Sequence, residues 1–407
     1  MIIPENIQKI INDIEFKGYE VYIVGGAVRD FLLGKIPSDY DLTTNATPEE
    51  LKEIFNEHKY IKVYDVGIKH GTLTLCYNNF CVEITTYRTE KGYLDLRHPD
   101  NVSFVKSIDD DLKRRDFTIN AICYRNGIYD PLNGQKDLKN KLIRAIGNPN
   151  ERFNEDALRI IRGIRFAAVL NFDIEKNTKN SIFTNKELLK LISIERIRDE
   201  FDKIIMSNNV CNILNIYYDV LFEFFREFGN IYNVNMNFLI IDKLEKNLVL
   251  RLVGFFYTII KNTFSFKVGL DYQNIIKKIL LNFKYSLDTA YSVSSVIFNL
   301  NLELTNNKIS IKTHLSSLGY DILEDLIRFK IAILETNQKD TTELTKISLT
   351  LKNIINNNEV YSLKQLNING SNLVELGINE GPQIGNILND ILLLIINEKL
   401  INKKECI

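Results

Sequence analysis

The pattern of apolar residues changes at about residue 150, and this change constrains the fold more than any other feature. Before it, short β-branched and aromatic runs alternate with segments of helical periodicity. After it, strand patterns disappear, and apolar residues recur at helical spacing, as at Leu158, Ile161 and Ile164. The sequence therefore predicts an α+β head with a mixed β-sheet and flanking helices, followed by an all-helical remainder.

Within the head, the alternation predicts individual elements. The expected strands are Glu20–Val24, Tyr60–Val66, Gly71–Tyr77 and Phe80–Tyr87, with a turn at Asn78-Asn79. The expected helices are Ala27–Leu33, Pro48–Asn56 with Thr47 as N-cap, and Leu112–Tyr124. Because one hydrophobic core rarely grows past about 250–300 residues, the 407 residues are expected to form two to four domains.

Composition excludes several classes of protein. The 45% hydrophobic and 25% charged residues are typical of a soluble chain, and runs such as Ile391–Ile396 are too short to cross a bilayer. The net charge of −1 argues against binding nucleic acid by bulk charge, so any basic groove must be local. Five scattered cysteines without CxxC spacing predict a reduced, cytoplasmic protein. The four histidines lack zinc-site spacing, so a catalytic metal must depend on carboxylates.

Three acidic residues in the head have the pattern of a metal site. Asp39 and Asp41 are two apart in an extended segment and are expected to project from one face. Glu83 lies in an apolar strand, where an unpaired carboxylate is costly to bury. Oxygen ligands of this kind favour a hard divalent cation, and we expect Mg²⁺ held by Asp39 and Asp41. Three carboxylates around two metal ions are typical of nucleotidyl transfer.

Glycine and arginine clusters suggest a phosphate-binding site. Gly25 and Gly26 join a strand to a helix, where backbone N–H groups can approach a phosphate. Two later clusters are rich in guanidinium groups, and taken alone each is more typical of a charged surface helix than of a ligand site. One contains Arg114, Arg115, Asp116 and Asn120, and the other contains Asp156, Arg159 and Arg162 on one expected helical face.

Taken together, these segments resemble five ordered motifs of the class II tRNA nucleotidyltransferases, which are the CCA-adding enzymes, and of the related bacterial poly(A) polymerases. The resemblance covers residues 20 to about 205 and some of the C-terminal tail. The motifs are Gly25-Gly26-Ala27-Val28-Arg29-Asp30, Asp39-Tyr40-Asp41, Arg114–Ala121, Glu155–Arg159 and Ser193–Ile197.

The resemblance implies four domains and a role for each candidate residue. The domains are a head at 1–140, a neck at 141–208, a body at 209–310 and a tail at 311–407, in an elongated protein that holds the acceptor and T arms of tRNA. Asp39, Asp41 and Glu83 would be catalytic, Asp116 would bind the ribose, and Asp156 with Arg159 would read the base of CTP or ATP. The triphosphate would be bound by Gly25, Gly26, Arg29, Arg114 and Arg115. No obligate protein partner is expected.

The chemistry of the two bases agrees with that assignment. Cytosine presents an N4 amino donor beside an N3 acceptor, and adenine presents an N6 donor beside an N1 acceptor. Asp156 accepts and Arg159 donates, which suits both bases. Uracil and guanine present the reverse order of acceptor and donor, so Asp156 and Arg159 would each face a group with which they cannot pair. Each unpaired group costs about 1–3 kcal/mol of binding free energy.

Three activities remain open within the family: full CCA addition, partial addition of CC or A, and poly(A) synthesis. Asp65–Thr72 resembles CCA-adding enzymes and lacks the basic run that is usual in poly(A) polymerases. Arg88–Pro99 resembles the flexible loop that CC-only enzymes tend to lack, and we expect it to act as a lever when the pocket changes from C to A. These features favour full CCA addition. A non-catalytic RNA-binding protein is less consistent with the three carboxylates.

Overall fold

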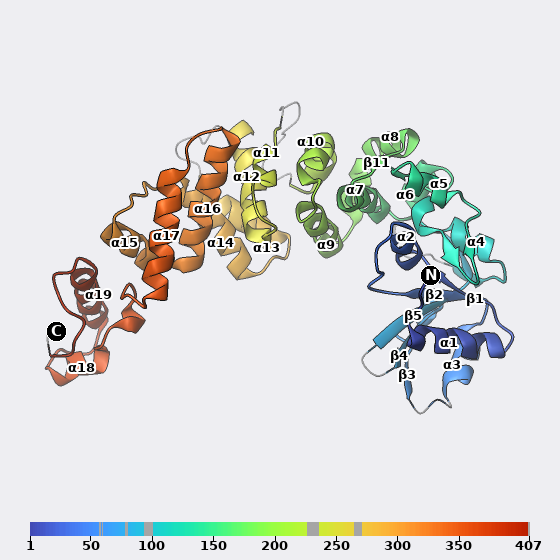
Figure 1. The fold of residues 1–407 in the computed structure, drawn as a ribbon, viewed down its shortest axis with the longest axis horizontal. Helices are drawn as coiled ribbons and strands as arrows, with labels where there is room; N and C mark the ends of the chain where they lie inside the picture. Colours follow the sequence, from blue (N-terminus) through green and yellow to red (C-terminus); the bar gives the residue numbers. More distant parts are fainter. Residues whose placement is uncertain are drawn as a thin grey trace. The chain divides into compact units, whose positions relative to one another are not determined.

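A computed structural model describes the chain except for residues 57, 59, 78–79, 93–100, 226–235, 264–270 and 406–407. The chain forms two compact units (Figure 1). The first contains Met1–Asn209 with 216–228, and the second contains Val210–Asn215 with 229–407. A mixed sheet in the first unit and helices elsewhere confirm the predicted α+β class. The four-domain division is finer than these two units and stays a prediction.

A seven-stranded sheet forms the centre of the head, in the order β3-β4-β5-β2-β1-β8-β9. Among its described strands, β2 and β5 are the one parallel pair, and the other neighbours are antiparallel. Its strands are β1 Val21–Val24, β2 Asp41–Thr44, β3 Ile61–Tyr64, β4 Thr72–Tyr77, β5 Phe80–Thr86, β8 Cys123–Tyr124 and β9 Ile128–Tyr129. Two small sheets pair β6 Arg88–Lys91 with β7 Asn101–Phe104, and β10 Leu142–Ile143 with β11 Asp173–Ile174.

The four expected strands are confirmed as β1, β3, β4 and β5. The expected turn at Asn78-Asn79 lies outside the described residues, although Tyr77 and Phe80 on its two sides are paired. The expectation that the cysteines are reduced is wrong for one pair, because Cys76 and Cys81 form a disulfide. The antiparallel register of β4 and β5 places these two residues directly opposite each other, with their Cα atoms 4.0 Å apart.

Helices α1 and α3 lie against strands β1 and β3 of the sheet (Figure 1). Helix α3 begins as expected at Pro48, because the Thr47 hydroxyl accepts from Glu50 N–H while the Glu50 carboxylate accepts from Thr47 N–H. The helices of this unit are α1 Glu5–Phe16, α2 Gly26–Leu32, α3 Pro48–Asn56, α4 Ile108–Lys113, α5 Gly134–Lys139, α6 Pro149–Glu155, α7 Leu158–Leu170, α8 Lys176–Thr184 and α9 Ile194–Ile205. Short 3₁₀ turns are η1 Ile68–His70, η2 Thr118–Asn120, η3 Lys186–Leu191 and η4 Phe222–Phe224.

The expected helix at Leu112–Tyr124 is wrong. Helix α4 ends at Lys113, and the chain continues through η2 into β8. Tertiary hydrogen bonds interrupt the helix, because Thr118 N–H donates to the carbonyl of Arg144 and Phe117 forms a β-bridge with Ala145. Asp116 and Asn120 are therefore not on consecutive turns of one α-helix.

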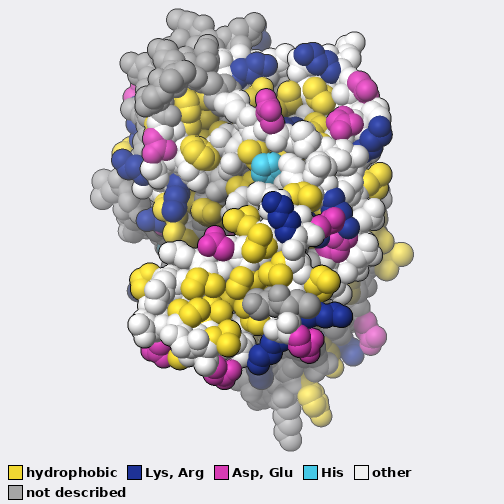
Figure 2. Space-filling view, turned by 90° about the vertical axis from the view of Figure 1, so that its left-hand side faces the viewer, with side chains coloured by type: hydrophobic (Ala, Val, Ile, Leu, Met, Phe, Trp, Pro, Cys, Tyr) yellow, Lys and Arg dark blue, Asp and Glu magenta, His cyan; other side chains and the backbone are white. Residues whose placement is uncertain are grey.

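The second unit is helical throughout its described residues. Its core includes an apolar cluster on α15, α16 and α17 that contains Leu315, Ile327 and Leu351. Hydrophobic side chains gather on its face near α18 and α19 (Figure 2), where Leu376 and Leu393 are exposed. The helices are α11 Leu239–Asp242, α12 Leu248–Thr263, α13 Tyr272–Asn282, α14 Leu287–Phe298, α15 Lys308–Leu318, α16 Tyr320–Thr336, α17 Thr342–Asn356, α18 Gly370–Glu375 and α19 Pro382–Ile396, with 3₁₀ turns η6 Asn299–Asn301 and η7 Leu363–Gln365. Helix α10, Val210–Leu221, belongs in part to each unit.

No helix among the residues that the structure describes is both long and apolar enough to span a bilayer.

The packing of α5 against η2 predicts that Gly134 is essential for the fold near Asn120. A Cβ atom at Gly134 would lie 2.3 Å from the Thr118 carbonyl oxygen and 2.7 Å from Ile122 Cγ1. We expect Gly134→Ala to lower the free energy of unfolding by about 1–3 kcal/mol, measured by urea denaturation, because backbone must move to accommodate it. Gly127→Ala is the matched control, since a Cβ atom there meets nothing within 4 Å. Equal unfolding midpoints for the two variants would contradict this account.

Candidate active site

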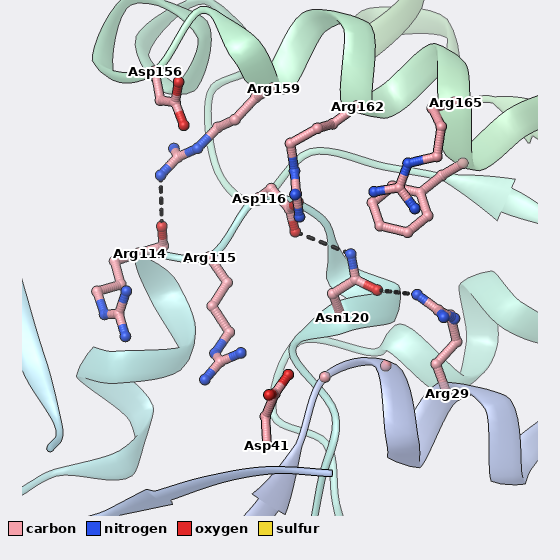
Figure 3. Close-up of a pocket in the computed structure, with 13 residues that line it drawn as sticks. Arg29, Asp41, Arg114, Arg115, Asp116, Asn120, Asp156, Arg159, Arg162 and Arg165 are labelled. Carbon is pink, nitrogen blue, oxygen red and sulfur yellow. Dashed lines mark hydrogen bonds and ion pairs between the residues drawn. The ribbon is translucent and has the colours of Figure 1, made fainter. Parts of the chain in front are cut away.

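A cavity of about 380 Å³ in the first unit brings together all the nucleotide-binding residues predicted from the sequence (Figure 3). It lies where α2, the segment after α4 and helix α7 meet. Of the three predicted catalytic carboxylates, only Asp41 lines it. The lining residues are Gly25, Gly26, Arg29, Asp41, Arg114, Arg115, Asp116, Asn120, Asp156, Arg159, Arg162, Arg165 and Phe166.

The two glycines form the turn between β1 and α2. Gly25 has φ 75° and ψ −128°, a conformation that side chains other than glycine avoid. A Cβ atom on Gly25 would lie 3.6 Å from Arg115 Nη1 and 3.8 Å from Asp41 Oδ2. The turn thus brings the start of α2 close to one cation and one carboxylate at the floor of the cavity.

The predicted catalytic carboxylates lie on, or just before, two neighbouring strands. Asp41 begins β2 and is paired in register with Glu83 on β5, while Asp39 precedes Asp41 by two residues. Burial raises the pKa of Asp41, Arg115 opposes this rise, and Glu83 and Asp39 add to it. Among the described residues, no three acidic, His or Cys side chains are arranged to hold a metal ion as they stand. The donor set nevertheless has the right chemistry, because crowded carboxylate oxygens suit a hard cation.

Asp111, fully buried at the end of α4, orients both arginines that follow it. Its Oδ1 accepts from Arg114 Nη2 at 2.7 Å, and its Oδ2 lies 3.4 Å from Arg115 Nη2. Burial opposes ionisation of Asp111, but Arg114 and Arg115 hold its pKa below the usual value. Arg114 is also bound to Glu90 of β6 at 3.2 Å. Arg115 Nε is buried without an acceptor in the described part of the chain, which leaves a donor for an oxyanion.

A hydrogen-bonded chain crosses the cavity wall from α7 to α2 (Figure 3). Arg162 donates to Asp116 Oδ2 through Nη2 at 2.6 Å and through Nε at 2.9 Å. Asn120 Nδ2 donates to Asp116 Oδ1 at 3.1 Å, and Asn120 Oδ1 accepts from Arg29 Nη1 at 2.9 Å. Burial disfavours the charged carboxylate, yet Arg162 and Asn120 outweigh it and lower the pKa of Asp116 to about 2. Asp116 is thus a fixed anion that joins three elements.

Arg159 is held by acceptors from three directions. Its Nη1 donates to Glu155 Oε2 at 2.9 Å and to the Arg152 carbonyl at 3.3 Å, and its Nη2 donates to the Arg114 carbonyl at 2.9 Å. A guanidinium has five N–H donors. The described contacts therefore leave Nε and one N–H of Nη2 for a ligand.

Asp156 is placed differently from the sequence prediction. It lies in an extended conformation between α6 and α7, and only Arg159 and Arg162 are on α7 itself. The helix start explains this position, because Asp156 Oδ1 accepts from Leu158 N–H at 3.1 Å. Burial raises the pKa of Asp156, and Arg196 and Arg159 oppose the rise. The expectation of one helical face is therefore wrong for Asp156, although all three residues meet in the cavity.

Two lining residues, Arg165 and Phe166, were missing from the predicted site. The Arg165 guanidinium carbon lies 3.6 Å from the Phe166 ring centroid, and Arg165 Nε donates to the buried Glu200 of α9 at 2.8 Å. Arg29 also lies over Phe166, at 5.3 Å. Arg165 could have been predicted, because it follows Arg162 by three residues and so lies on the same face of the helix. Nothing in the sequence distinguished Phe166 from an aromatic residue of the core.

Comparison with known proteins extends along the whole chain. Residues 21–144 match the family model of the poly A polymerase head domain. Residues 171–217 match the probable RNA and SrmB-binding site of polymerase A, and residues 263–407 match a putative domain 2 of tRNA nucleotidyltransferase. The three models thus cover parts of both structural units.

Individual relatives agree with these models. A CCA-adding enzyme from Ligilactobacillus salivarius is 35% identical over 413 aligned positions, covering 99% of this chain and 95% of that relative. One from Staphylococcus epidermidis is 33% identical, covering 98% and 96%. The crystal structure of the Bacillus stearothermophilus CCA-adding enzyme in complex with CTP superposes with a TM-score of 0.79 at 26% identity, covering 99% of this chain and 96% of that one. This chain therefore belongs to the family of the CCA-adding enzymes.

Proposed function

We propose that this protein is a CCA tRNA nucleotidyltransferase, which adds C, C and A to the 3′ end of tRNA from CTP and ATP and releases pyrophosphate. One observation carries the proposal: a single cavity joins a glycine turn and Arg115 at one end to Asp156 and Arg159 at the other. Cations at the first end suit a triphosphate, and the second end has one acceptor and one donor for a base. Similarity to CCA-adding enzymes over nearly the whole chain supports the same conclusion.

For the reaction itself, Asp39 and Asp41 would hold divalent metal, which we propose to be Mg²⁺, with Glu83 beside the primer hydroxyl. When bound, such ions favour ionisation of a 3′-hydroxyl and stabilise a departing pyrophosphate. Gly25, Gly26 and the free Nε of Arg115 would position the triphosphate, together with Arg29 and Arg114. The arginines are partly neutralised by protein carboxylates, so they are already oriented before the nucleotide arrives.

Base selection follows from the fixed position of Arg159. Its remaining N–H donors suit the ring acceptor of cytosine or adenine, and Asp156 Oδ2 suits the amino group. Because Arg159 is bound to three acceptors of the protein, rotation to suit uracil or guanine would break those hydrogen bonds. The protein thereby replaces a nucleic-acid template. We also propose that Asp116, already an anion, accepts from a ribose hydroxyl.

We propose that the helical part of the chain binds the acceptor and T arms of tRNA, and that the enzyme works in the cytoplasm. With a net charge of −1, such binding must depend on locally grouped cations and on the shape of the A-form stem. Matches to an RNA-binding model and to a tRNA nucleotidyltransferase model support this part of the proposal.

The direct test is incubation of purified protein with a tRNA transcript that lacks CCA. We expect two C residues with CTP alone, CCA with CTP and ATP, and one A on a transcript that ends in CC. A product that stops at CC in the presence of ATP would identify a CC-adding enzyme. A homopolymer of A on any RNA end would identify a poly(A) polymerase.

The metal assignment predicts that Asp41→Ala lowers incorporation of every NTP to below about 1% of wild type, as does Asp39→Ala. The dissociation constant for tRNA should change by no more than a few-fold, because these residues act at the reacting end. Asp65→Ala is the control, since Asp65 is exposed and paired only with Lys52 in the described structure. Substantial turnover by Asp41→Ala would rule out the assignment.

The base-reading assignment predicts relaxed selectivity for Arg159→Ala. The preference for CTP over UTP should fall by about 5- to 150-fold in kcat/KM, corresponding to about 1–3 kcal/mol for a lost hydrogen-bonding group. Arg125→Ala is the control, because Arg125 pairs with Glu15 and does not line the cavity. If Arg159→Ala kept its selectivity and only unfolded more easily, Arg159 would be structural.

A further inference from the structure

A second cavity, of about 330 Å³, lies entirely within the second unit, between α11, α12 and the end of α16. Its wall contains Tyr257 and Lys261, one turn apart on α12, together with Leu239 and Ile333. None of the described residues that line it is acidic. The volume is at the low end of the range of about 300–1,000 Å³ for small-molecule sites, so it suits one nucleoside.

The aromatic ring and the cation of this cavity are suitably placed for a nucleotide. The Tyr257 and Phe329 rings form a T-shaped pair with centroids 5.3 Å apart, which fixes the orientation of Tyr257. Lys261 Nζ lies 5.7 Å from the Tyr257 ring centroid. Within the described part of the chain, no carboxylate lies within ion-pair distance of Lys261. The cavity therefore presents an aromatic surface beside an unneutralised cation.

Two amides at the cavity complete its hydrogen-bonding capacity. Asn262 Nδ2 donates to the Thr258 carbonyl at 2.7 Å, and Asn337 Nδ2 donates to the Ile333 carbonyl at 2.6 Å. These hydrogen bonds fix both side chains. No described residue donates a hydrogen bond to either carboxamide oxygen. Each oxygen can therefore accept from an amino or imino group of a ligand.

We propose that this cavity binds an unpaired nucleotide of the tRNA substrate, with its base against Tyr257 and its phosphate near Lys261. Unpaired bases of RNA are commonly recognised by stacking on aromatic rings, with hydrogen bonds to their edges. The inference rests on the proposed function, because that function makes tRNA the substrate. The site would anchor tRNA by a nucleotide that takes no part in the reaction.

The test compares tRNA affinity for wild type, Tyr257→Leu and Lys261→Met at one salt concentration. Stacking is worth about 1–3 kcal/mol per base, so Tyr257→Leu should raise the dissociation constant about 5- to 150-fold. Lys261→Met should raise it by less and should reduce the salt dependence of binding. The controls are Tyr291→Leu, an exposed tyrosine on α14, and Lys278→Met on α13, which should both bind as wild type.

Ultraviolet crosslinking gives an independent measurement that does not depend on a substitution. A tRNA transcript carrying 4-thiouridine should crosslink to the peptide containing Tyr257, through a residue that is unpaired in tRNA. Crosslinks to that peptide only from paired positions would overturn the proposal. The proposal would also be overturned if Tyr257→Leu and Lys261→Met both bound tRNA as tightly as wild type.

The same variants separate this proposal from the proposed function. CMP and AMP incorporation at saturating tRNA should be unchanged in Lys261→Met, with only the KM for tRNA raised. Normal incorporation with normal tRNA affinity in both variants would reject the site and keep the function. Tight tRNA binding that depends on Tyr257, without any incorporation by wild type, would reject the function and keep the site. If Lys261→Met lost binding of a mononucleotide but kept the tRNA affinity of wild type, the cavity would be a site for free nucleotides instead.

Discussion

The ion pair between Asp116 and Arg162 is the interaction on which the cavity depends. It joins the segment after α4 to helix α7, and Asn120 extends the connection to Arg29 on α2. Because the pKa of Asp116 is lowered to about 2, the pair contributes stability above the usual carboxyl pKa of about 3.9. That contribution is lost as the pH falls through about 2, so the wall stays charged at any pH at which the enzyme would work.

A second set of contacts positions Arg159 at the end of the cavity that is proposed to read the base. Glu90 of β6 binds Arg114, and the carbonyl of Arg114 accepts from Arg159. The strand pair β6–β7 is thus attached through Arg114 to Arg159, the arginine proposed to read the base. This arrangement gives the expected lever at Arg88–Pro99 a physical connection, although residues 93–100 lie outside the described part of the chain and the lever stays a prediction.

Local patterns in the sequence predicted the parts of the fold that local forces decide. Strands β1, β3, β4 and β5 follow from β-branched runs, and α3 follows from Thr47 and Pro48 at its start. The helix predicted at Leu112–Tyr124 was wrong because the backbone there pairs with Arg144 and Ala145, which are distant in sequence. The Cys76–Cys81 disulfide was missed although the expected turn at Asn78-Asn79 pairs Tyr77 with Phe80 and so places the two cysteines opposite each other. The nucleotide-binding residues predicted from motifs line one cavity, whereas the place of Phe166 beside Arg29 depends on how α7 packs near α2.

The central claim is that Asp156 and Arg159 read the base without a nucleic-acid template. The most direct measurement is kcat/KM for CTP and for an analogue whose 4-amino group is replaced by hydrogen, on a tRNA transcript that lacks CCA. We expect wild type to use the analogue about 10- to 100-fold less efficiently, because Asp156 loses its donor. The difference should shrink in Asp156→Ala. Equal kcat/KM values for the two nucleotides with wild type would contradict the account.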